Sequence, residues 1–386
     1  MGAKQALTKE RERIISQVIN DNGFTKKRQV REFLNDHKLF RDISARYFND
    51  LIKFDFEPDI IDQGHIITGR STLKGANGEL KQEWVKTSID KNKQLEALKL
   101  SIKELIENAP PAPKINRNKT LTNNNLLNQY TIADYHFGMF AVMAETGEDF
   151  NTEIAEELLI NWVKMGIETS PKAEECVLCL LGDFQHWDNI EPLTPTSKHL
   201  LDASTRFPIL VRLTIRVIDV IISMLLQKYK KVNVIDAEGN HDISSSIWRR
   251  ELFAYRYKDN ERVYIDNSIL PYYAFSWGSV ALFYHHGHKK KLDALDKVFA
   301  SYFKELYGRS KHIYAHTGHL HHKKLIESSL MILEQHPTLS TGDAHSVRGG
   351  YKSKRNSQII TYNKHFGEVA RLSISPEIIQ HETNNN

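Results

Sequence analysis

The sequence contains few cysteines, no long apolar run and no large excess of charge. Cys176 and Cys179 are the only two cysteines among 386 residues, which argues against a disulfide framework and is typical of reducing compartments. They form a CxxC inside an apolar run, but residues three apart in a strand point to opposite faces of a sheet. We therefore expect two core cysteines, and neither a metal site nor a redox pair.

Signals for membrane insertion and export are also missing. The most apolar stretch, residues 217–226, is short and is interrupted by Asp219, so it predicts a buried helix and not a membrane span. The first residues, MGAKQALTKERERII, contain no apolar segment of the kind that precedes a signal-peptide cleavage site. We expect no secretion and a cytoplasmic location.

Charge and histidine are distributed unevenly along the chain. The formal net charge is +4, yet residues 1–54 alone hold 12 Lys/Arg against 7 Asp/Glu, a larger surplus than that of the whole chain. Only His37 and His65 of the 18 histidines precede residue 136. This asymmetry indicates a basic N-terminal part and a later part that carries the imidazole chemistry.

The N-terminal part predicts a small helical module followed by strands. Apolar residues recur at helical spacing in three segments between residues 8 and 54, and with their basic surplus they resemble a helix-turn-helix or winged module. A helical bundle that contacts protein is the alternative. Residues 60–88 predict short strands with bends at glycines, and a helix follows at 93–108. The Pro- and Asn-rich segment 109–125 predicts a linker, so we place the domains at 1–118 and 119–386.

Beyond the linker, apolar runs alternate between strand and helix spacing. Strand-like runs occupy residues 129–133, 176–181, 231–237, 279–284 and 312–315, and helical segments at 153–168 and 206–229 lie between them. This alternation predicts an α/β layered fold.

Each of these five strands runs directly into potential metal ligands. In chain order the clusters are Asp134 with His136, Asp183, the Asn240-His241-Asp242 triplet, the HHGH of residues 285–288, and His319 with His321. Because ligands bind beyond the carboxyl ends of strands in open α/β sheets, we expect the five clusters to converge on one site.

The residue types suit a pair of divalent cations. Imidazole and carboxylate groups suit manganese, iron and zinc, and the lack of thiolates disfavours a structural zinc site. The D-x-H and H-x-H pairs place both side chains on one face of an extended segment, so that both can bind one ion. Glycines before Asp183, Asn240 and His319 allow sharp turns as the chain leaves the sheet.

The order D-x-H, GD, GNHD, H-G-H, G-H-x-H across residues 128–375 resembles the signature of the calcineurin-like metallophosphoesterase superfamily. The resemblance implies a β-sandwich flanked by helices and two divalent ions, with Mn²⁺ as first choice and iron, zinc or magnesium as alternatives. The implied ligands are Asp134, His136 and His321 for the first ion, Asp183 as the bridge, and Asn240, His286 and His319 for the second. For the H-G-H motif we take His286, next to Gly287, and not His285. His241 would contact the scissile phosphate and act as general acid.

The implied mechanism is a hydrolysis that uses both ions. Two ions about 3.5–4 Å apart would hold a water between them, lower its pKa and bind the phosphate oxygens. The resulting hydroxide would attack phosphorus in line. Asp242 either orients the ligands from behind or is the N-cap residue of the next helix.

Three features favour DNA as the substrate. Residues 182–186, GDFQH, are similar to the nuclease subunit of double-strand-break repair complexes, in which the histidine three places after the aspartate, here His186, approaches the phosphate. The basic N-terminal module would bind nucleic acid. The layout, with its STL at 71–73 and QEWVK at 82–86, resembles phage and prophage metallophosphoesterases described as DNA repair exonucleases, which implies a bacterial or phage-infected cytosol.

Two other classes use the same residues differently. A phosphomonoesterase, or a phosphodiesterase for cyclic nucleotides or dinucleotides, would need the same seven ligands with a narrower cleft. A DNA-binding regulator with an inactive hydrolase domain would be expected to have lost ligands, and the seven are all present. An enzyme is therefore the prediction, with a nuclease placed before a small-molecule phosphoesterase.

Overall fold

Two compact units make up the chain in the computed structural model, Met1–Ile102 and Lys103–Asn386. The structure describes residues 60–61, 65–74, 80–89, 115–117, 122–195, 197–342, 347, 349–350 and 353–385. The three helices predicted between residues 8 and 54, and the helix predicted at 93–108, lie outside these ranges. The helix-turn-helix interpretation and the domain boundary near residue 118 therefore stay predictions.

The described part of the N-terminal unit is a three-stranded antiparallel sheet. Its order is β1 (Ile60–Ile61), β2 (His65–Lys74) and β3 (Leu80–Ile89). β2 pairs with β3 along most of its length, with register shifts near Gly69 and Lys74. The strands predicted in residues 60–88 are confirmed.

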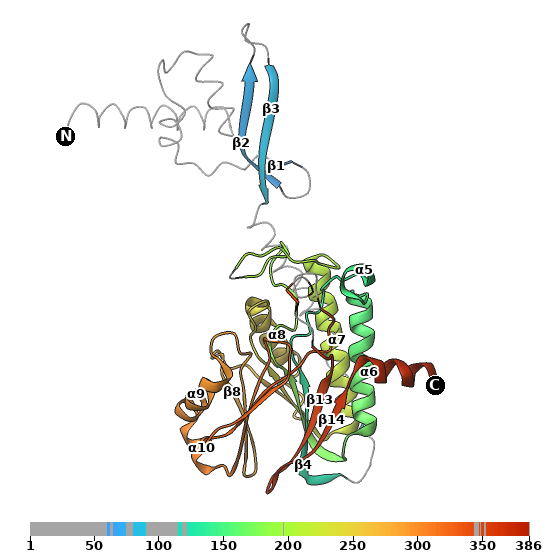
Figure 1. The fold of residues 1–386 in the computed structure, drawn as a ribbon, viewed down its shortest axis with the longest axis vertical. Helices are drawn as coiled ribbons and strands as arrows, with labels where there is room; N and C mark the ends of the chain where they lie inside the picture. The colour runs from blue at the N-terminus through green and yellow to red at the C-terminus, as the bar shows by residue number, and fades with distance from the viewer. Residues whose placement is uncertain are drawn as a thin grey trace, which may run out of the picture. The chain divides into compact units, whose positions relative to one another are not determined.

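The C-terminal unit contains two mixed β-sheets (Figure 1). One sheet has the order β14-β13-β4-β5-β6-β7 and the other the order β11-β12-β10-β9-β8. The first consists of β4 (Asn123–Ile132), β5 (Ala173–Leu180), β6 (Lys231–Asp236), β7 (Val263–Asp266), β13 (Ser357–Asn363) and β14 (Gly367–Ile374). The second consists of β8 (Tyr273–Trp277), β9 (Val280–Tyr284), β10 (His312–Thr317), β11 (Lys324–Glu327) and β12 (Ile332–Gln335). Buried residues of both sheets, among them Val177 and Leu282, belong to one cluster, so the unit is the predicted β-sandwich.

Helices cover the outer faces of both sheets (Figure 1). On the six-stranded sheet, Trp162 of α6 (Thr152–Thr169) meets Tyr130 edge to face, with ring centroids 5.8 Å apart. On the five-stranded sheet, Phe299 of α9 (Leu295–Tyr302) stacks on Phe283 at 5.0 Å. The remaining helices are α5 (Met143–Thr146), α7 (Phe207–Lys228), α8 (Ile243–Arg256), η1 (Leu292–Ala294), α10 (Lys304–Arg309) and α12 (Pro376–Asn385). The helices predicted at 153–168 and 206–229 are confirmed as α6 and α7.

Strand pairing extends one predicted element. β4 begins at Asn123, six residues before the predicted strand, because residues 126–131 pair with β13 and residues 127–132 with β5. Its first residues lie in the segment whose composition predicted a linker. Among these first residues only Asn123 pairs, with Ala173 of β5, and β4 thus overrides a local preference for irregular structure.

The two cysteines lie in β5 as expected. Both are free and buried. Cys179 belongs to the core between the sheets, whereas Cys176 lies on the face that carries α7, close enough to Lys228 to interact with it. They therefore occupy opposite faces of the strand and share no bond.

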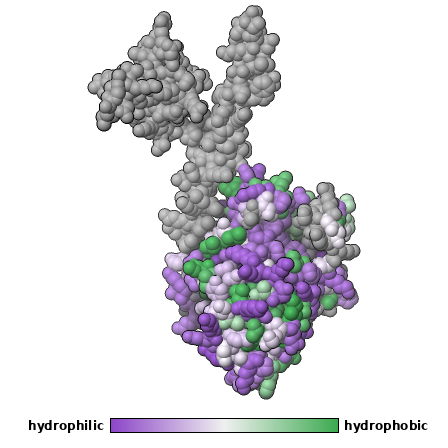
Figure 2. Space-filling view, turned by 60° about the vertical axis from the view of Figure 1, so that its left-hand side comes forward, coloured by the Kyte–Doolittle hydropathy of each residue, from purple (hydrophilic) through white to green (hydrophobic). Residues whose placement is uncertain are grey.

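The apolar run at residues 217–226 forms part of α7. Ile218, Ile222 and Leu226 are buried there, as the sequence predicted. Among the helices that the structure describes, none combines the length and apolarity needed to cross a membrane. On the face drawn in Figure 2, hydrophilic residues predominate on the coloured surface and hydrophobic residues are interspersed among them.

Candidate metal centre

The residues that follow the five strands converge in the structure. Ligand atoms lie within 4.8 Å of one another in three groups that involve them: Asp134–His136–His321, Asp183–His286–His319 and His136–His186–His241. The groups adjoin, since His286 Nε2 lies 3.8 Å from Asp134 Oδ1. The structure thus brings together every residue that the sequence assigned to the site.

The first group contains two imidazoles that face each other beside a carboxylate. His136 Nε2 lies 3.2 Å from His321 Nε2, and His321 Nε2 lies 3.4 Å from Asp134 Oδ1. Burial lowers the pKa of His136 far below its usual value, and the neighbouring histidines lower it further. The ring is therefore neutral, which is the form that binds metals.

The second group is organised around His286. Its Nδ1–H donates to the carbonyl oxygen of Leu181 at 2.9 Å, which directs Nε2 towards the site. That nitrogen lies 3.0 Å from Asp183 Oδ2 and 3.1 Å from Asn240 Oδ1. One imidazole nitrogen and two side-chain oxygens therefore meet at a point where a proton or a metal ion can lie between them.

The electrostatics of this point also favour a cation. Burial alone would lower the pKa of His286, but the carboxylates of Asp183 and Asp134 raise it to about 10. A proton thus satisfies the site in the bare chain, and a divalent ion can take its place. With imidazole, carboxylate and amide-oxygen donors and no thiolate, the seven residues fit two divalent ions of the manganese, iron or zinc type.

The backbone of the ligand loops is strained. Six described residues other than glycine have positive φ, and five of these are proposed ligands: Asp134 (49°), His136 (50°), Asp183 (48°), His319 (76°) and His321 (56°). Such conformations cost on the order of 1–3 kcal/mol each and concentrate at functional sites. The sequence analysis expected the D-x-H and H-x-H segments to be extended, and this expectation was wrong. In each segment both ligand residues have left-handed backbone, so the chain turns around the site.

The hydrogen bonds that hold these turns run between loops. His319 N–H donates to both carboxylate oxygens of Asp134, at 3.0 and 2.8 Å. The hydroxyls of Thr338 and Ser340 donate to the Asp134 carbonyl oxygen, at 2.7 and 3.0 Å. Thr338 and Ser340 were not anticipated, because they follow β12 in a segment that carries no ligand-type motif.

The glycines before the ligands act mainly by leaving space. A Cβ on Gly239 would lie 2.0 Å from Asp183 Oδ1, and one on Gly318 would lie 2.5 Å from Asp134 Oδ2. Only Gly182 also has a positive φ, of 83°. The expectation of three glycine-dependent turns is therefore correct at Gly182, whereas the other two permit a carboxylate to approach the backbone.

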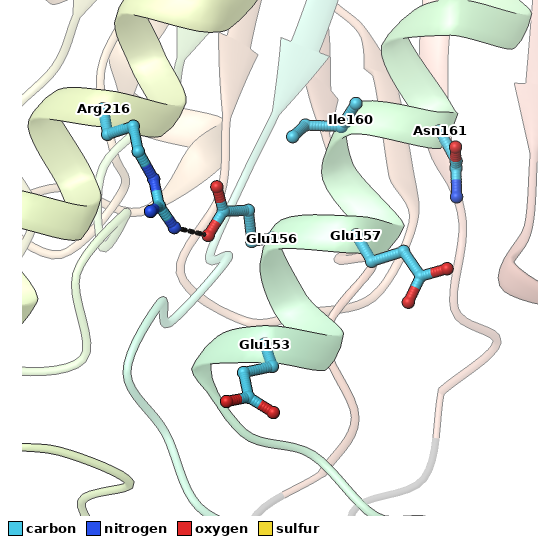
Figure 3. Close-up of a pocket in the computed structure, with 6 residues that line it drawn as sticks. All are labelled: Glu153, Glu156, Glu157, Ile160, Asn161 and Arg216. Carbon is cyan, nitrogen blue, oxygen red and sulfur yellow. Dashed lines mark hydrogen bonds and ion pairs between the residues drawn. The ribbon is translucent and has the colours of Figure 1, made fainter.

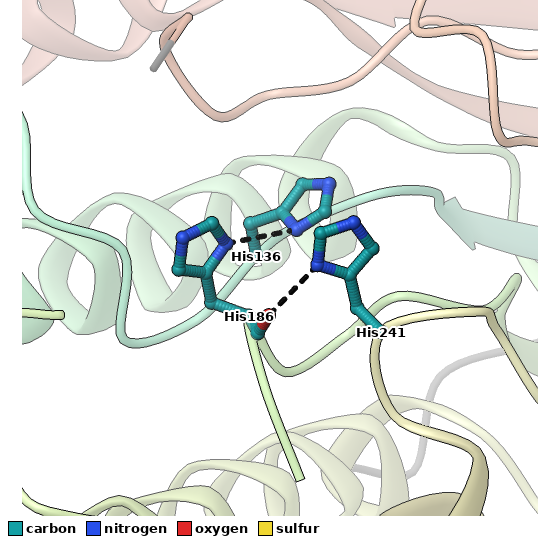
Figure 4. Close-up of side chains that lie close together, drawn as sticks. All are labelled: His136, His186 and His241. Carbon is teal, nitrogen blue, oxygen red and sulfur yellow. Dashed lines mark hydrogen bonds between the residues drawn. The ribbon is translucent and has the colours of Figure 1, made fainter. Parts of the chain in front are cut away.

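His186 and His241 lie beside His136 (Figure 4). His186 Nδ1 is 3.2 Å from His136 Nδ1, and the His186 and His241 rings stack with centroids 5.7 Å apart. His241 Nδ1–H donates to the carbonyl oxygen of His186 at 2.8 Å. This bond leaves His241 Nε2 as the nitrogen that can face a substrate.

Asp242 lies fully buried behind the ligand loops. Its carboxylate accepts the backbone N–H groups of Asp183, Gln185 and Gly239 at 3.1, 3.1 and 3.2 Å. It occupies the N-cap position of α8 but makes no side-chain capping bond. Of the two roles predicted for Asp242, these contacts fit orientation of the ligand loops and not capping, because its oxygens bind backbone amides of those loops and cannot reach a substrate.

Arg249 holds Asp242 in place. This role was not predictable from the sequence, because arginines on amphipathic helices usually face solvent. Its side chain is completely buried. The guanidinium donates to Asp236 Oδ2 and Oδ1 at 2.8 and 2.7 Å, to Gln185 Oε1 at 2.9 Å, and contacts Asp242 Oδ2 at 3.0 Å. One side chain thus connects the end of β6 with the loops that carry Asp183 and Asn240.

Arg249→Met should weaken metal binding about 10- to 100-fold, the usual effect of removing a group that orients metal ligands. Arg256→Met is the matched control, since Arg256 makes a comparable two-point bond to Asp219 from the same helix. Calorimetric titration with Mn²⁺ and the melting temperature of the metal-free chain would separate the effects. Arg249→Lys keeps the charge if the methionine variant does not fold. Unchanged metal affinity in both Arg249 variants would refute the positioning role.

A fourth group of ligand-type side chains lies between the sheets and is linked by internal hydrogen bonds, although His336 Nδ1 has no partner. His316 Nδ1 and His336 Nε2 are 2.8 Å apart, and the Tyr362 hydroxyl lies 3.0 Å from His316 Nε2. The nearby Glu334 carboxylate is bound by Arg371 at 2.6 and 2.8 Å. We interpret this group as a core polar network.

A surface hollow between α6 and α7 is separate from the metal centre. Three glutamates, Asn161, Ile160 and Arg216 line it, and Arg216 points across to Glu156 (Figure 3). The two side chains form an ion pair. None of the predicted site residues contributes to this hollow.

No protein-family model matches the chain, and no curated protein matches it. Among solved structures, a dimetal phosphatase from Danio rerio has 10% sequence identity and a TM-score of 0.35, with 64% of this chain and 98% of that chain covered. An archaeal phosphodiesterase has 11% identity and a TM-score of 0.31, covering 64% and 99%. A protein of Streptococcus pneumoniae described as a predicted phosphoesterase has 10% identity and a TM-score of 0.27, covering 64% and 98%. With values of this size, the function of this chain has to be inferred from the site itself.

Proposed function

We propose that this chain is a calcineurin-like metallophosphoesterase that hydrolyses phosphodiesters with two divalent metal ions, and that DNA is its substrate. The observation that carries the proposal is the convergence of seven nitrogen- and oxygen-donor side chains, five of them on residues with strained backbone. Manganese is the ion we propose, with iron, zinc and magnesium as alternatives.

The proposed roles of the chain's own residues follow from their contacts. Two divalent ions bound here would polarise the phosphate oxygens and lower the pKa of the attacking water. Asp183 Oδ1 accepts the His241 N–H at 2.7 Å, which ties the loop of the proposed acid to the proposed bridging ligand. With its Nδ1–H bound to the His186 carbonyl, His241 would act as the acid when Nε2 also carries a proton, which it would give to the leaving oxygen. His186, stacked against His241, would contact the phosphate.

Basic residues beside the site support a polyanionic substrate. Lys289, Lys290 and Lys291 directly follow His288, and Lys323 and Lys324 closely follow His321; all five are exposed. Residues 1–54 add a basic surplus. A nucleic-acid strand carries several phosphates, and several lysines are needed to neutralise them. A phosphomonoester carries one phosphate and does not need them. We propose that the N-terminal unit also binds DNA.

A substrate panel tests the proposal. Purified chain with Mn²⁺ should degrade single-stranded or linear double-stranded DNA, and chelation should stop the reaction. The panel should include para-nitrophenyl phosphate, bis-para-nitrophenyl phosphate and a cyclic nucleotide. Rapid turnover of the monoester or the cyclic nucleotide with intact DNA would replace the nuclease by a small-molecule phosphoesterase. If none of the substrates is turned over in the presence of metal ions, the proposal that the chain is an enzyme is contradicted.

A further inference from the structure

Four aromatic rings lie in a continuous row beside the second metal group. We call Tyr302, Tyr272, His285 and His288 the aromatic ladder. Successive ring centroids lie 5.2 Å apart from Tyr302 to Tyr272, 4.9 Å from Tyr272 to His285, and 5.6 Å from His285 to His288. The last two pairs are nearly parallel, with interplanar angles of 19° and 7°. The ladder therefore links the end of α9 with the loop that follows β9.

One end of the ladder lies at the metal centre. The His288 ring is 5.4 Å from the His286 ring and 6.4 Å from the His319 ring, centroid to centroid. Both of these histidines belong to the second ligand group. A chain of substrate that leaves the metal centre on this side would thus pass the ladder.

The other end of the ladder lies at the surface. Tyr302 is 59% exposed, whereas Tyr272 is half-buried and neighbours both Tyr302 and His285. Core packing explains Tyr272, which contacts Phe299 at 6.0 Å. Core packing does not explain why the last ring of the ladder, Tyr302, is exposed. The outer face of Tyr302 is therefore available to a ligand with a flat ring.

The charge beside the ladder indicates the kind of ligand. The exposed lysines 289–291 connect His288 to η1 and α9. Lys289 pairs with Glu238, next to Gly239 in the loop of Asn240, which ties this basic segment to the metal centre. Stacking rings combined with positive charge along a path are the features that bind single-stranded nucleic acid.

We propose that Tyr302 stacks on an unpaired base of a single-stranded polynucleotide whose scissile phosphate lies at the metal centre. The proposal rests on the proposed nuclease function and specifies its substrate. Three further rings separate Tyr302 from the ligand histidines. The base that stacks on Tyr302 therefore belongs to a different nucleotide from the one whose phosphate is cleaved.

The test is binding of a labelled, hydrolysis-resistant phosphorothioate oligodeoxynucleotide, measured by fluorescence anisotropy with Mn²⁺. Tyr302→Ala should weaken binding about 10-fold, the scale of one lost base–aromatic stack. Tyr302→Phe should bind like the wild type. Tyr255→Ala is the matched control, because Tyr255 of α8 is 56% exposed and carries no proposed role.

An abasic oligodeoxynucleotide separates stacking from general damage. Wild type and Tyr302→Ala should bind it equally, since the phosphates remain and the base is missing. Equal binding of the base-containing strand by wild type and Tyr302→Ala would overturn the proposal, as would the same loss on the abasic strand. If the wild type hydrolyses no phosphoester, the proposed function fails, yet this comparison still decides whether Tyr302 stacks on a base.

Discussion

Asp183→Asn is expected to abolish phosphoester hydrolysis. Asp183 Oδ2 lies 3.0 Å from His286 Nε2, and Oδ1 accepts the backbone N–H of His241 at 2.7 Å, so one carboxylate belongs to the second ligand group and holds the loop of the proposed acid. Asparagine keeps the shape but removes the negative charge and turns an N–H₂ group towards the site. We expect a loss of at least about a thousandfold in turnover, the upper range for removal of one electrostatic group.

Asp219→Asn is the control for this variant. Asp219 is bound by Arg256 and Tyr257, away from the ligand groups, so its loss removes a carboxylate without touching the centre. Turnover and bound metal should be measured for both variants at saturating Mn²⁺. Removal of one electrostatic group lowers turnover at least about a hundredfold. If Asp183→Asn keeps more than about one per cent of wild-type turnover, the bridging role is contradicted.

Metal removal is expected to have the second-largest effect. Dialysis against a chelator should abolish activity and lower the melting temperature, because buried carboxylates and imidazoles lose the cations that hold them together. An ion present at a thousand times its dissociation constant stabilises a fold by about 4 kcal/mol. For a domain of this size that corresponds to roughly 10 °C per ion.

Calorimetry with and without Mn²⁺ measures this shift. Returning Mn²⁺ should restore the melting temperature and the activity together, and Mg²⁺, iron and zinc can be ranked in the same way. Full activity after exhaustive chelation, or an unchanged melting temperature on adding any of these ions, would argue against a metal centre at these residues.

The five strands that lead into the site, and the ligand residues after them, were predictable from local patterns, whereas β7, β8 and β11 to β14 were not predicted. Runs such as CVLCLL are short and continuously apolar, which is typical of a buried strand, and each is followed directly by ligand-type residues. Because parallel strands β4, β5 and β6 end on the same side, their clusters had to meet. His286 was chosen over His285 because it stands next to Gly287 in the H-G-H motif, and the structure places His286 against Asp183.

The parts that could not be predicted depend on contacts between distant residues. No local pattern shows that Asp134 and His136 adopt positive φ, since hydrogen bonds from Thr338 and Ser340 hold that turn. The burial of Arg249 is likewise not indicated by any local pattern, because it depends on how α8 packs beneath two loops. The aromatic ladder joins α9 to the loop after β9, and neither segment indicates stacking alone.

Anomalous diffraction from Mn²⁺-loaded crystals tests the two-metal centre most directly. We expect two peaks about 3.5–4 Å apart, one contacted by Asp134, His136 and His321 and the other by Asn240, His286 and His319, with Asp183 between them. No peak at these residues, a single peak, or ions bound only at His316 and His336 would contradict the account.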